Sequence, residues 1–170
     1  MATTEATLRS FFLHSARYAV VGASSNTQKF GHKGMSQSRG SHGYIILTST
    51  VFVWYLNHEL PVTPINPAST TIDVGSKSYP AVKSLSALEA PKETGVSVIT
   101  PPHVTRKTLE EAKNLGISSI WLQPGTFDDE VLKYAYDNFS AVLAGDGGRG
   151  SEGWCVLVDG ERGLKAAGKL

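Results

Sequence analysis

A turn of small residues is the part of this sequence best suited to binding chemistry. Residues 17–21 form a short apolar run typical of a buried strand, and the run stops at Gly22-Ala23-Ser24-Ser25. A small-residue turn between a strand and a helix leaves backbone N–H groups unpaired, and the helix N-terminus adds roughly half a positive charge. This turn is therefore a candidate binding site for a phosphate or a similar anion.

Lys29 follows the turn closely and is a candidate point charge for the same phosphates. Each feature also has a simpler interpretation. Lys29 would then be a surface lysine in water, and residues 22–25 a tight connection in which a serine caps the next helix. The choice between these interpretations depends on whether other loops of the chain meet the same turn.

Strand-like and helix-like segments alternate along the chain, which predicts an α/β fold with a doubly wound parallel sheet between two helical layers. The expected strands, about five in number, cover residues 17–21, 60–67, 95–100, 117–122 and 140–145. Helices are expected over residues 3–14 and 104–114, after Ser25, and from Thr126 or Asp128. The remaining segments are expected to be a polar connection over 69–78, a turn over 79–82, a short helix over 84–88 and a glycine-rich tail over 146–170.

The carboxyl ends of the expected strands all carry Gly, Pro or Ser. Right-handed crossovers place such ends along one edge of a parallel sheet. The loops that meet there are Gly22–Ser25, Asn66-Pro67, the loop with Pro101 and Pro102, and Gln123–Gly125. Ligands of doubly wound sheets bind outside this edge, where the strand order reverses. We therefore expect the four loops to form one crevice.

Five short motifs, in this order, resemble those of the small single-domain coenzyme A-binding proteins. They are Val20-Val21-Gly22-Ala23-Ser24, Pro64-Ile65-Asn66-Pro67, Tyr79-Pro80, Pro101-Pro102 and Trp121-Leu122-Gln123-Pro124-Gly125. Those proteins are similar to the N-terminal domain of the succinyl-CoA synthetase alpha chain. The resemblance implies a Rossmann-like fold that binds CoA or an acyl-CoA at the carboxyl edge of the sheet.

The resemblance also implies roles for particular residues. By position, Gly22, Ala23, Ser24, Ser25 and Lys29 would hold the phosphates; Asn66, Pro67, Pro101 and Pro102 would line the nucleotide and its pantetheine arm; Gln123 and Gly125 would close the far side. The synthetase acts through a phosphorylated histidine in a second domain that these residues do not include. The resemblance therefore implies binding, an acyl-CoA ligase activity does not follow from it, and we identify no catalytic residue.

Composition narrows the class of protein. A hydrophobic content of 41% and a charged content of 18% are typical of one soluble domain, and a formal net charge of +1 argues against a general nucleic-acid binder. No segment approaches a membrane span, and no signal peptide is evident, so we expect a cytoplasmic protein. The histidines show no metal-ligand spacing. Cys155 is the single cysteine; a structural thiol is the simpler interpretation and a contact to the CoA thiol the alternative.

Two other functions are compatible with the same fold. An NAD(P)-dependent oxidoreductase is disfavoured because the turn lacks a full G-x-G-x-x-G and the second strand ends at Asn66 where an acidic ribose-binding residue is expected. A domain that serves only for protein interaction would show a crevice without room or basic character. Fold by itself does not choose among the three.

Residues 34–50 depart from the resemblance. The first part, up to Gly43, is polar and glycine-rich, and residues 44–50 are β-prone, whereas the family has one helix here. Removing 34–50 would join Phe30–Lys33 directly to Val51–His58 and give a helix of normal length. Two hypotheses account for the segment: a genuine insertion, such as a surface hairpin, or a retained intron, because Gly34-Met35-Ser36 and Leu47-Thr48-Ser49 are compatible with donor and branch-point codons.

The intron hypothesis makes a direct prediction. Sequencing of transcripts should recover a shorter in-frame product that lacks the codons of residues 34–50. Deep sequencing that recovers only the longer product would leave the insertion as the explanation.

Overall fold

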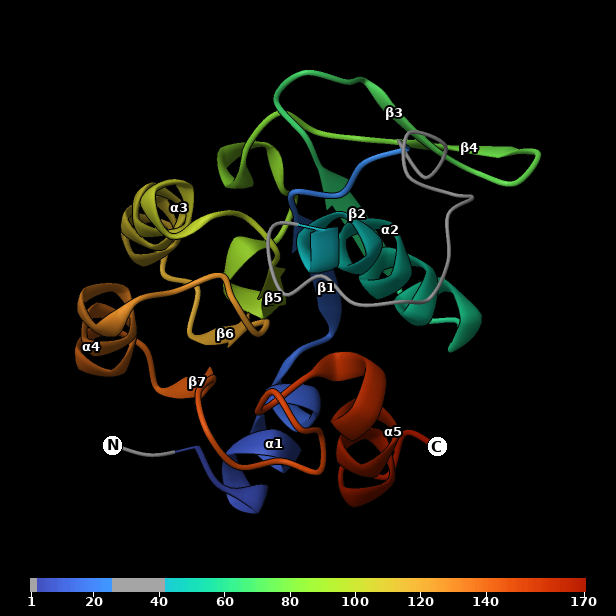
Figure 1. Cartoon of the computed structure of the whole chain (residues 1–170). Coiled ribbons are helices and arrows are strands. Elements are labelled where there is room, and N and C mark those ends of the chain that lie inside the picture. Colours follow the sequence, from blue (N-terminus) through green and yellow to red (C-terminus); the bar gives the residue numbers. More distant parts are fainter. Residues whose placement is uncertain (1–2, 26–41) are drawn as a thin grey trace.

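The computed structural model describes residues 3–25 and 42–170, excluding the side chains of residues 42–49. Its centre is a parallel sheet of five strands in the order β2-β1-β5-β6-β7 (Figure 1). These strands are β1 Arg17–Val21, β2 Val62–Ile65, β5 Thr94–Val98, β6 Ser119–Leu122 and β7 Ala141–Leu143. The predicted α/β class, with a Rossmann-like doubly wound sheet, is confirmed.

Five helices cover the sheet in the described part of the chain. They are α1 Glu5–His14, α2 His42–Asn57, α3 Pro102–Asn114, α4 Asp129–Asn138 and α5 Val156–Ala166. Figure 1 shows α1, α2 and α5 on one face and α3 with α4 on the other. Strand β1 is buried on both faces: Tyr18 and Val20 enter one core, Ala19 and Val21 the other. Burial on both sides explains why its sequence is a continuous apolar run.

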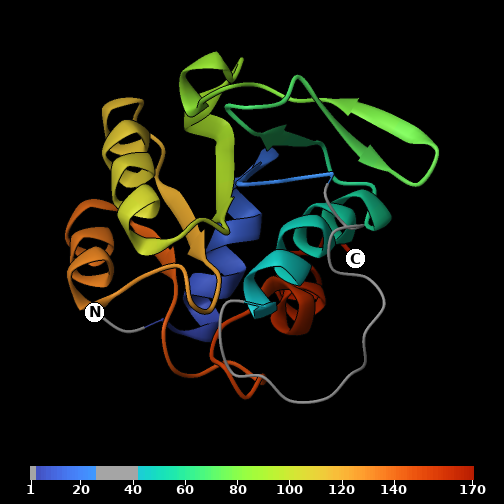
Figure 2. The ribbon, with the colours of Figure 1, turned by 45° about the horizontal axis from the view of Figure 1, so that its top comes forward.

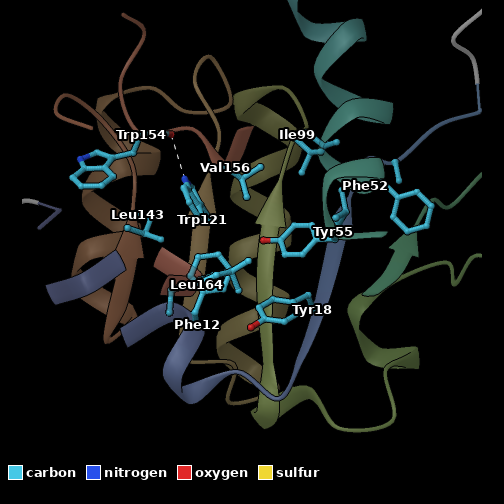
Figure 3. Close-up of a cluster of buried hydrophobic side chains, with 14 of the residues drawn as sticks. Phe12, Tyr18, Phe52, Tyr55, Ile99, Trp121, Leu143, Trp154, Val156 and Leu164 are labelled. Carbon is cyan, nitrogen blue, oxygen red and sulfur yellow. Dashed lines mark hydrogen bonds between the residues drawn. The ribbon is translucent and has the colours of Figure 1, made fainter. Parts of the chain in front are cut away.

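Aromatic rings fill the core beneath α1, α2 and α5 (Figure 3). The ring of Phe11 meets Trp121 edge-on with centroids 5.4 Å apart, and Tyr18 stacks on Tyr55 at 5.1 Å. The Tyr55 and Ser97 hydroxyls are hydrogen-bonded at 2.8 Å, which satisfies two buried polar groups in the centre of the sheet. Burial raises the pKa of the Tyr55 hydroxyl, so it stays neutral at ordinary pH.

The starts of two helices and the edge strand β2 are explained by the local sequence. Thr4 caps α1 by accepting a hydrogen bond from the Thr7 N–H, and Asp128 caps α4 through Val131 N–H. The second predicted strand is β2, which lies at one end of the sheet order. An edge position tolerates Pro64, since a proline has no N–H to give to a second neighbour.

Two predictions for residues 69–82 are wrong. The polar connection and the turn are in fact an antiparallel hairpin, β3 Thr71–Val74 and β4 Lys77–Pro80. A two-residue Gly-Ser loop between short alternating segments is a hairpin signal, and it was available in the sequence. Packing stabilises the hairpin: Ile72 is fully buried, and the Tyr79 ring meets Phe52 of α2 edge-on at 5.5 Å.

The β-prone run 44–50 is also helical, as the first part of α2. The second part of α2 is fixed by buried Val51, Phe52 and Tyr55. Extending an existing helix needs no new nucleus, whereas a strand needs a partner. The outer side of β2 is already bridged by Val82, which donates to Pro64 O at 3.1 Å. The rest of the unusual segment, together with Lys29, lies outside the described residues.

The glycine-rich tail contains a helix that the sequence analysis missed. Helix α5 packs on α1 and α2. Two of its glycines allow this close approach: a Cβ on Gly160 would lie 2.3 Å from the Trp54 ring, and one on Gly163 would lie 2.5 Å from the Phe12 ring. These glycines interrupt the apolar periodicity, which is why the pattern did not predict the helix.

Gly160→Ala should therefore destabilise the protein by about 1–3 kcal/mol, because the new methyl group would overpack against Trp54. At an exposed helical site the same change stabilises by roughly 0.5–1 kcal/mol. Urea unfolding should be measured in the native background and with Trp54→Phe, which removes the ring atoms that the methyl would meet. An equal cost in both backgrounds would contradict the packing explanation.

Candidate functional site

The strand order reverses between β1 and β5, so the loops after these two strands diverge at the carboxyl edge of the sheet. Gly22 stands at this point with φ 97°, and a Cβ there would lie 2.9 Å from Thr100 Cγ2. Only glycine adopts this backbone and leaves room for the Thr100 side chain. Main-chain bonds hold the end of β1 to both of its neighbours: Gly22 N donates to Ile65 O of β2, and Ile99 N, just after β5, donates to Val21 O, each at 3.0 Å.

Asn66 holds the turn in place. Its Nδ2 donates to Ala23 O at 2.8 Å, and its Oδ1 accepts from Ala68 N at 2.8 Å. Asn66 is predicted to line the nucleotide, and in the structure its Nδ2 and Oδ1 each have a backbone partner. Asn66 therefore fixes the distance between the loop after β1 and the loop after β2, and Pro67 beside it is exposed.

The hydroxyl of Ser25 links the β1 turn to a third element, the β3–β4 hairpin. Its Oγ accepts a hydrogen bond from Asp73 N, in the β3–β4 hairpin, at 2.8 Å. Figure 2 shows the segment after β1 running toward this hairpin. The turn is thus held by the neighbouring loop and by the hairpin together.

The two prolines after β5 begin helix α3. Pro101 is the N-cap residue and Pro102 occupies the first helical position, where the missing N–H costs nothing. Thr105 Oγ1, in the first turn of α3, donates to Thr100 O at 2.9 Å and so links the helix to the loop after β5. The sequence placed both prolines at the carboxyl edge beside the turn, and the structure has them there.

Gln123, at the end of β6, is fully buried. Its Oε1 accepts from Val156 N at the start of α5 at 3.0 Å, and its Nε2 has no hydrogen-bond partner in the described part of the structure. A buried amide donor without an acceptor is energetically costly. Gly125 follows in a turn closed by Thr126, whose N–H donates to Gln123 O at 3.2 Å.

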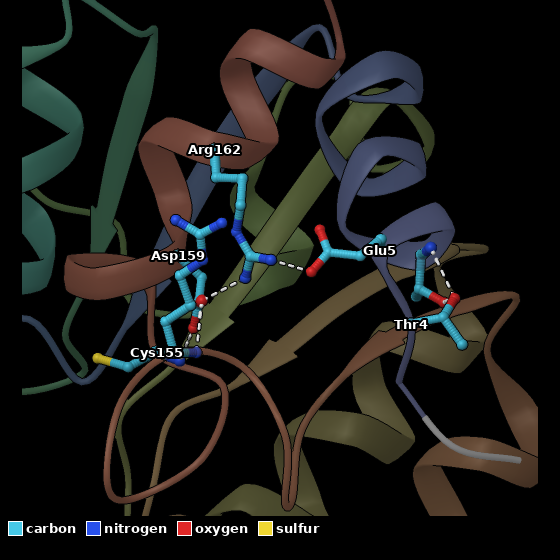
Figure 4. Close-up of polar contacts among 7 residues, drawn as sticks. Thr4, Glu5, Cys155, Asp159 and Arg162 are labelled. Carbon is cyan, nitrogen blue, oxygen red and sulfur yellow. Dashed lines mark hydrogen bonds and ion pairs between the residues drawn. The ribbon is translucent and has the colours of Figure 1, made fainter.

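The loop after β7 is organised by a buried carboxylate that the sequence analysis did not single out. Asp159 is fully buried and accepts from Arg149 N at 3.0 Å and Cys155 N at 3.2 Å (Figure 4). Arg162 donates to the same carboxylate at 2.5 Å and also pairs with Glu5 of α1. The glycine-rich run therefore folds onto α5, with its Arg149 backbone held by Asp159.

Cys155 is the N-cap residue of α5 and is buried. Burial raises the pKa of its thiol, and the nearby Asp159 and Glu152 charges act in the same direction. A thiol of this kind is protonated at neutral pH and is a poor nucleophile. These features favour the structural interpretation of Cys155.

A separate hollow lies at the opposite, amino edge of the sheet. It has a volume of about 210 Å³ and is lined by residues that include Arg17, Thr63 and Leu88. The Arg17 guanidinium there is paired with Glu89 at 3.1 Å. Because it lies at the amino edge, this hollow is not the crevice that the strand order predicts.

The sequence profile of the CoA binding domain matches residues 34–147, about two thirds of the chain. The chain belongs to this family. The match covers β2, β5, β6 and β7 and begins after the β1 turn. No curated protein is significantly similar to this CoA-binding domain protein.

Solved structures share its fold. A hypothetical protein from Pyrococcus horikoshii is 22% identical, with a TM-score of 0.64, over 95% of this chain and 92% of that one. A protein from Thermus thermophilus is 23% identical, with a TM-score of 0.64, over 95% and 99%. A conserved hypothetical protein from Pyrococcus furiosus is 23% identical, with a TM-score of 0.54, over 72% and 86%. At these identities the likeness shows the fold alone.

The described residues include no helix long and apolar enough to cross a membrane, and no group of His, Cys, Asp or Glu arranged to hold a metal ion.

The buried thiol gives a prediction about reactivity. Iodoacetamide should alkylate Cys155 in the folded protein at pH 8 on the order of tenfold more slowly than a free cysteine, because the raised pKa leaves little thiolate. The rate should increase with pH above the ordinary thiol range and should reach that of free cysteine in urea. Alkylation of the native protein as fast as in urea would show an accessible thiol instead.

Proposed function

We propose that this domain binds coenzyme A or an acyl-CoA in the crevice at the carboxyl edge of the sheet, with no catalytic step of its own. Membership of the CoA-binding domain family is the observation that carries the proposal. The β1 turn supports it, because Gly22 lets the chain turn tightly at the switch point of the sheet, where doubly wound folds bind their ligands. Within this proposal, residues 22–25 and Lys29 hold the phosphates.

The remaining loops would receive the rest of the ligand. Pro67, Pro101 and Pro102 offer apolar surfaces for the adenine and the pantetheine arm, and Asn66 positions the turn beside them. Gln123 Nε2, which has no acceptor in the described structure, would donate to an amide carbonyl of pantetheine. The Gly125 turn would keep Gln123 in place at the far side.

The rival ligand is a nicotinamide dinucleotide. Recognition of its ribose hydroxyls commonly uses an acidic side chain at the end of the second strand. Asn66 occupies that end here, and both of its polar groups are engaged with backbone. This arrangement favours CoA over NAD.

Isothermal titration calorimetry with CoA, acetyl-CoA and NAD should show heat for the CoA compounds and none for NAD. Lys29→Ala should weaken CoA binding by about tenfold and reduce its salt dependence, because a phosphate contact is lost. Lys165→Ala, the same charge change at an exposed position late in α5, is the control and should leave the affinity unchanged. Binding of NAD without binding of CoA would overturn the proposal.

A further inference from the structure

One hydrogen bond connects the β1 turn to an element far away in sequence. Asp73 N, in the β3–β4 hairpin, donates to Ser25 Oγ at 2.8 Å. A serine hydroxyl accepts and donates at the same time, so accepting from Asp73 leaves its proton free to donate. Ser25 is half-buried, and its residue lies in the turn at the switch point of the sheet. Its hydroxyl is therefore oriented by the hairpin.

The hairpin itself has a fixed base. Ile72, beside Asp73, is fully buried in the core beneath α1, α2 and α5, and Tyr79 packs edge-on against Phe52 of α2 at 5.5 Å. Ala81 N donates to Thr70 O at 2.9 Å and closes the hairpin at its lower end. Core packing thus fixes the position of the Asp73 N–H, and the hydrogen bond from this N–H in turn orients the Ser25 hydroxyl.

The Asn66 bridge makes this connection stiffer. Asn66 joins Ala23 O to Ala68 N, so the turn is held on its β2 side both before and at Ser25. A shift of the hairpin must therefore move Ser25 or break the Asp73–Ser25 bond.

We propose that the β3–β4 hairpin positions the Ser25 hydroxyl for a phosphate oxygen, so that anion binding at the turn and order in the hairpin are coupled. A chain of bonds from Asp73 N–H through Ser25 O–H to a phosphate strengthens each member by polarisation. Coupling is reciprocal. The free energy by which an ordered hairpin strengthens anion binding equals the free energy by which the bound anion stabilises the ordered hairpin. The inference rests on the proposed function in that the ligand carries phosphate.

Hydrogen exchange of residues 71–80 tests the connection without any ligand. Ser25→Ala should speed exchange of the Asp73 amide about fivefold, as expected for the loss of one hydrogen bond. Ser25→Thr, which keeps the hydroxyl, should restore slow exchange. Ser76→Ala makes the same chemical change in the exposed loop between β3 and β4 and should leave the Asp73 amide unaffected. Unchanged exchange in Ser25→Ala would overturn the inference.

Two ligands then separate the coupling from the identity of the natural ligand. Pyrophosphate, which probes the turn alone, should slow exchange across residues 71–80 in the native protein and in Ser76→Ala but not in Ser25→Ala. CoA should do the same if the proposed function holds. Protection by pyrophosphate without binding of CoA would keep the inference and refute the proposed function. Absence of protection by saturating pyrophosphate, or by bound CoA, would refute the coupling.

Discussion

The close approach of the loops after β1 and β5 is the constraint on which the rest of the site depends. Gly22 adopts φ 97° with no space for a side chain against Thr100. Its N–H donates to Ile65 O of β2, and the neighbouring Val21 O accepts from Ile99 N just after β5. A doubly wound sheet places its ligand where the strand order reverses. The chain can turn tightly there because nothing larger than glycine separates the two strand ends. Asn66 and the hairpin then fix the turn from the β2 side.

A second constraint acts beyond β6 and β7, at the start of α5. The fully buried Asp159 carboxylate gathers two backbone N–H groups and Arg162, and Arg162 reaches Glu5 of α1. Breaking one partner of a buried charge cluster leaves a charge without compensation, which is strongly destabilising. This cluster orients the start of α5, whose Val156 N–H in turn holds the Gln123 side chain. The position of the Gln123 side chain at the end of β6 therefore depends on a charge cluster in α5.

Family membership and fold agree on a CoA-binding domain, but the proposed phosphate site and the family match cover different residues. The match starts at Gly34, beyond the turn, while Lys29 lies outside the described structure. The segment 34–50, foreseen as an atypical insertion or a retained intron, contributes at least its second half to α2. Anion capture by the turn and the origin of this segment stay predictions, and each has its own experiment.

The sequence by itself determined the parallel sheet, its strand ends and the position of Gly22, because burial on two faces and turn chemistry leave local patterns. It also predicted that α4 starts from Thr126 or Asp128, and Asp128 is its N-cap, because a cap is a local hydrogen bond. Only the tertiary structure decided the helical state of residues 44–50 and α5, and packing fixed the hairpin, for which the Gly75-Ser76 loop is the one local signal. Those elements depend on Phe52, Trp54 and Phe12, which are distant in sequence from the hairpin and from the glycines they meet. A window of neighbouring residues contains no record of such contacts, so local propensity predicted a loop, a strand and a tail in their place.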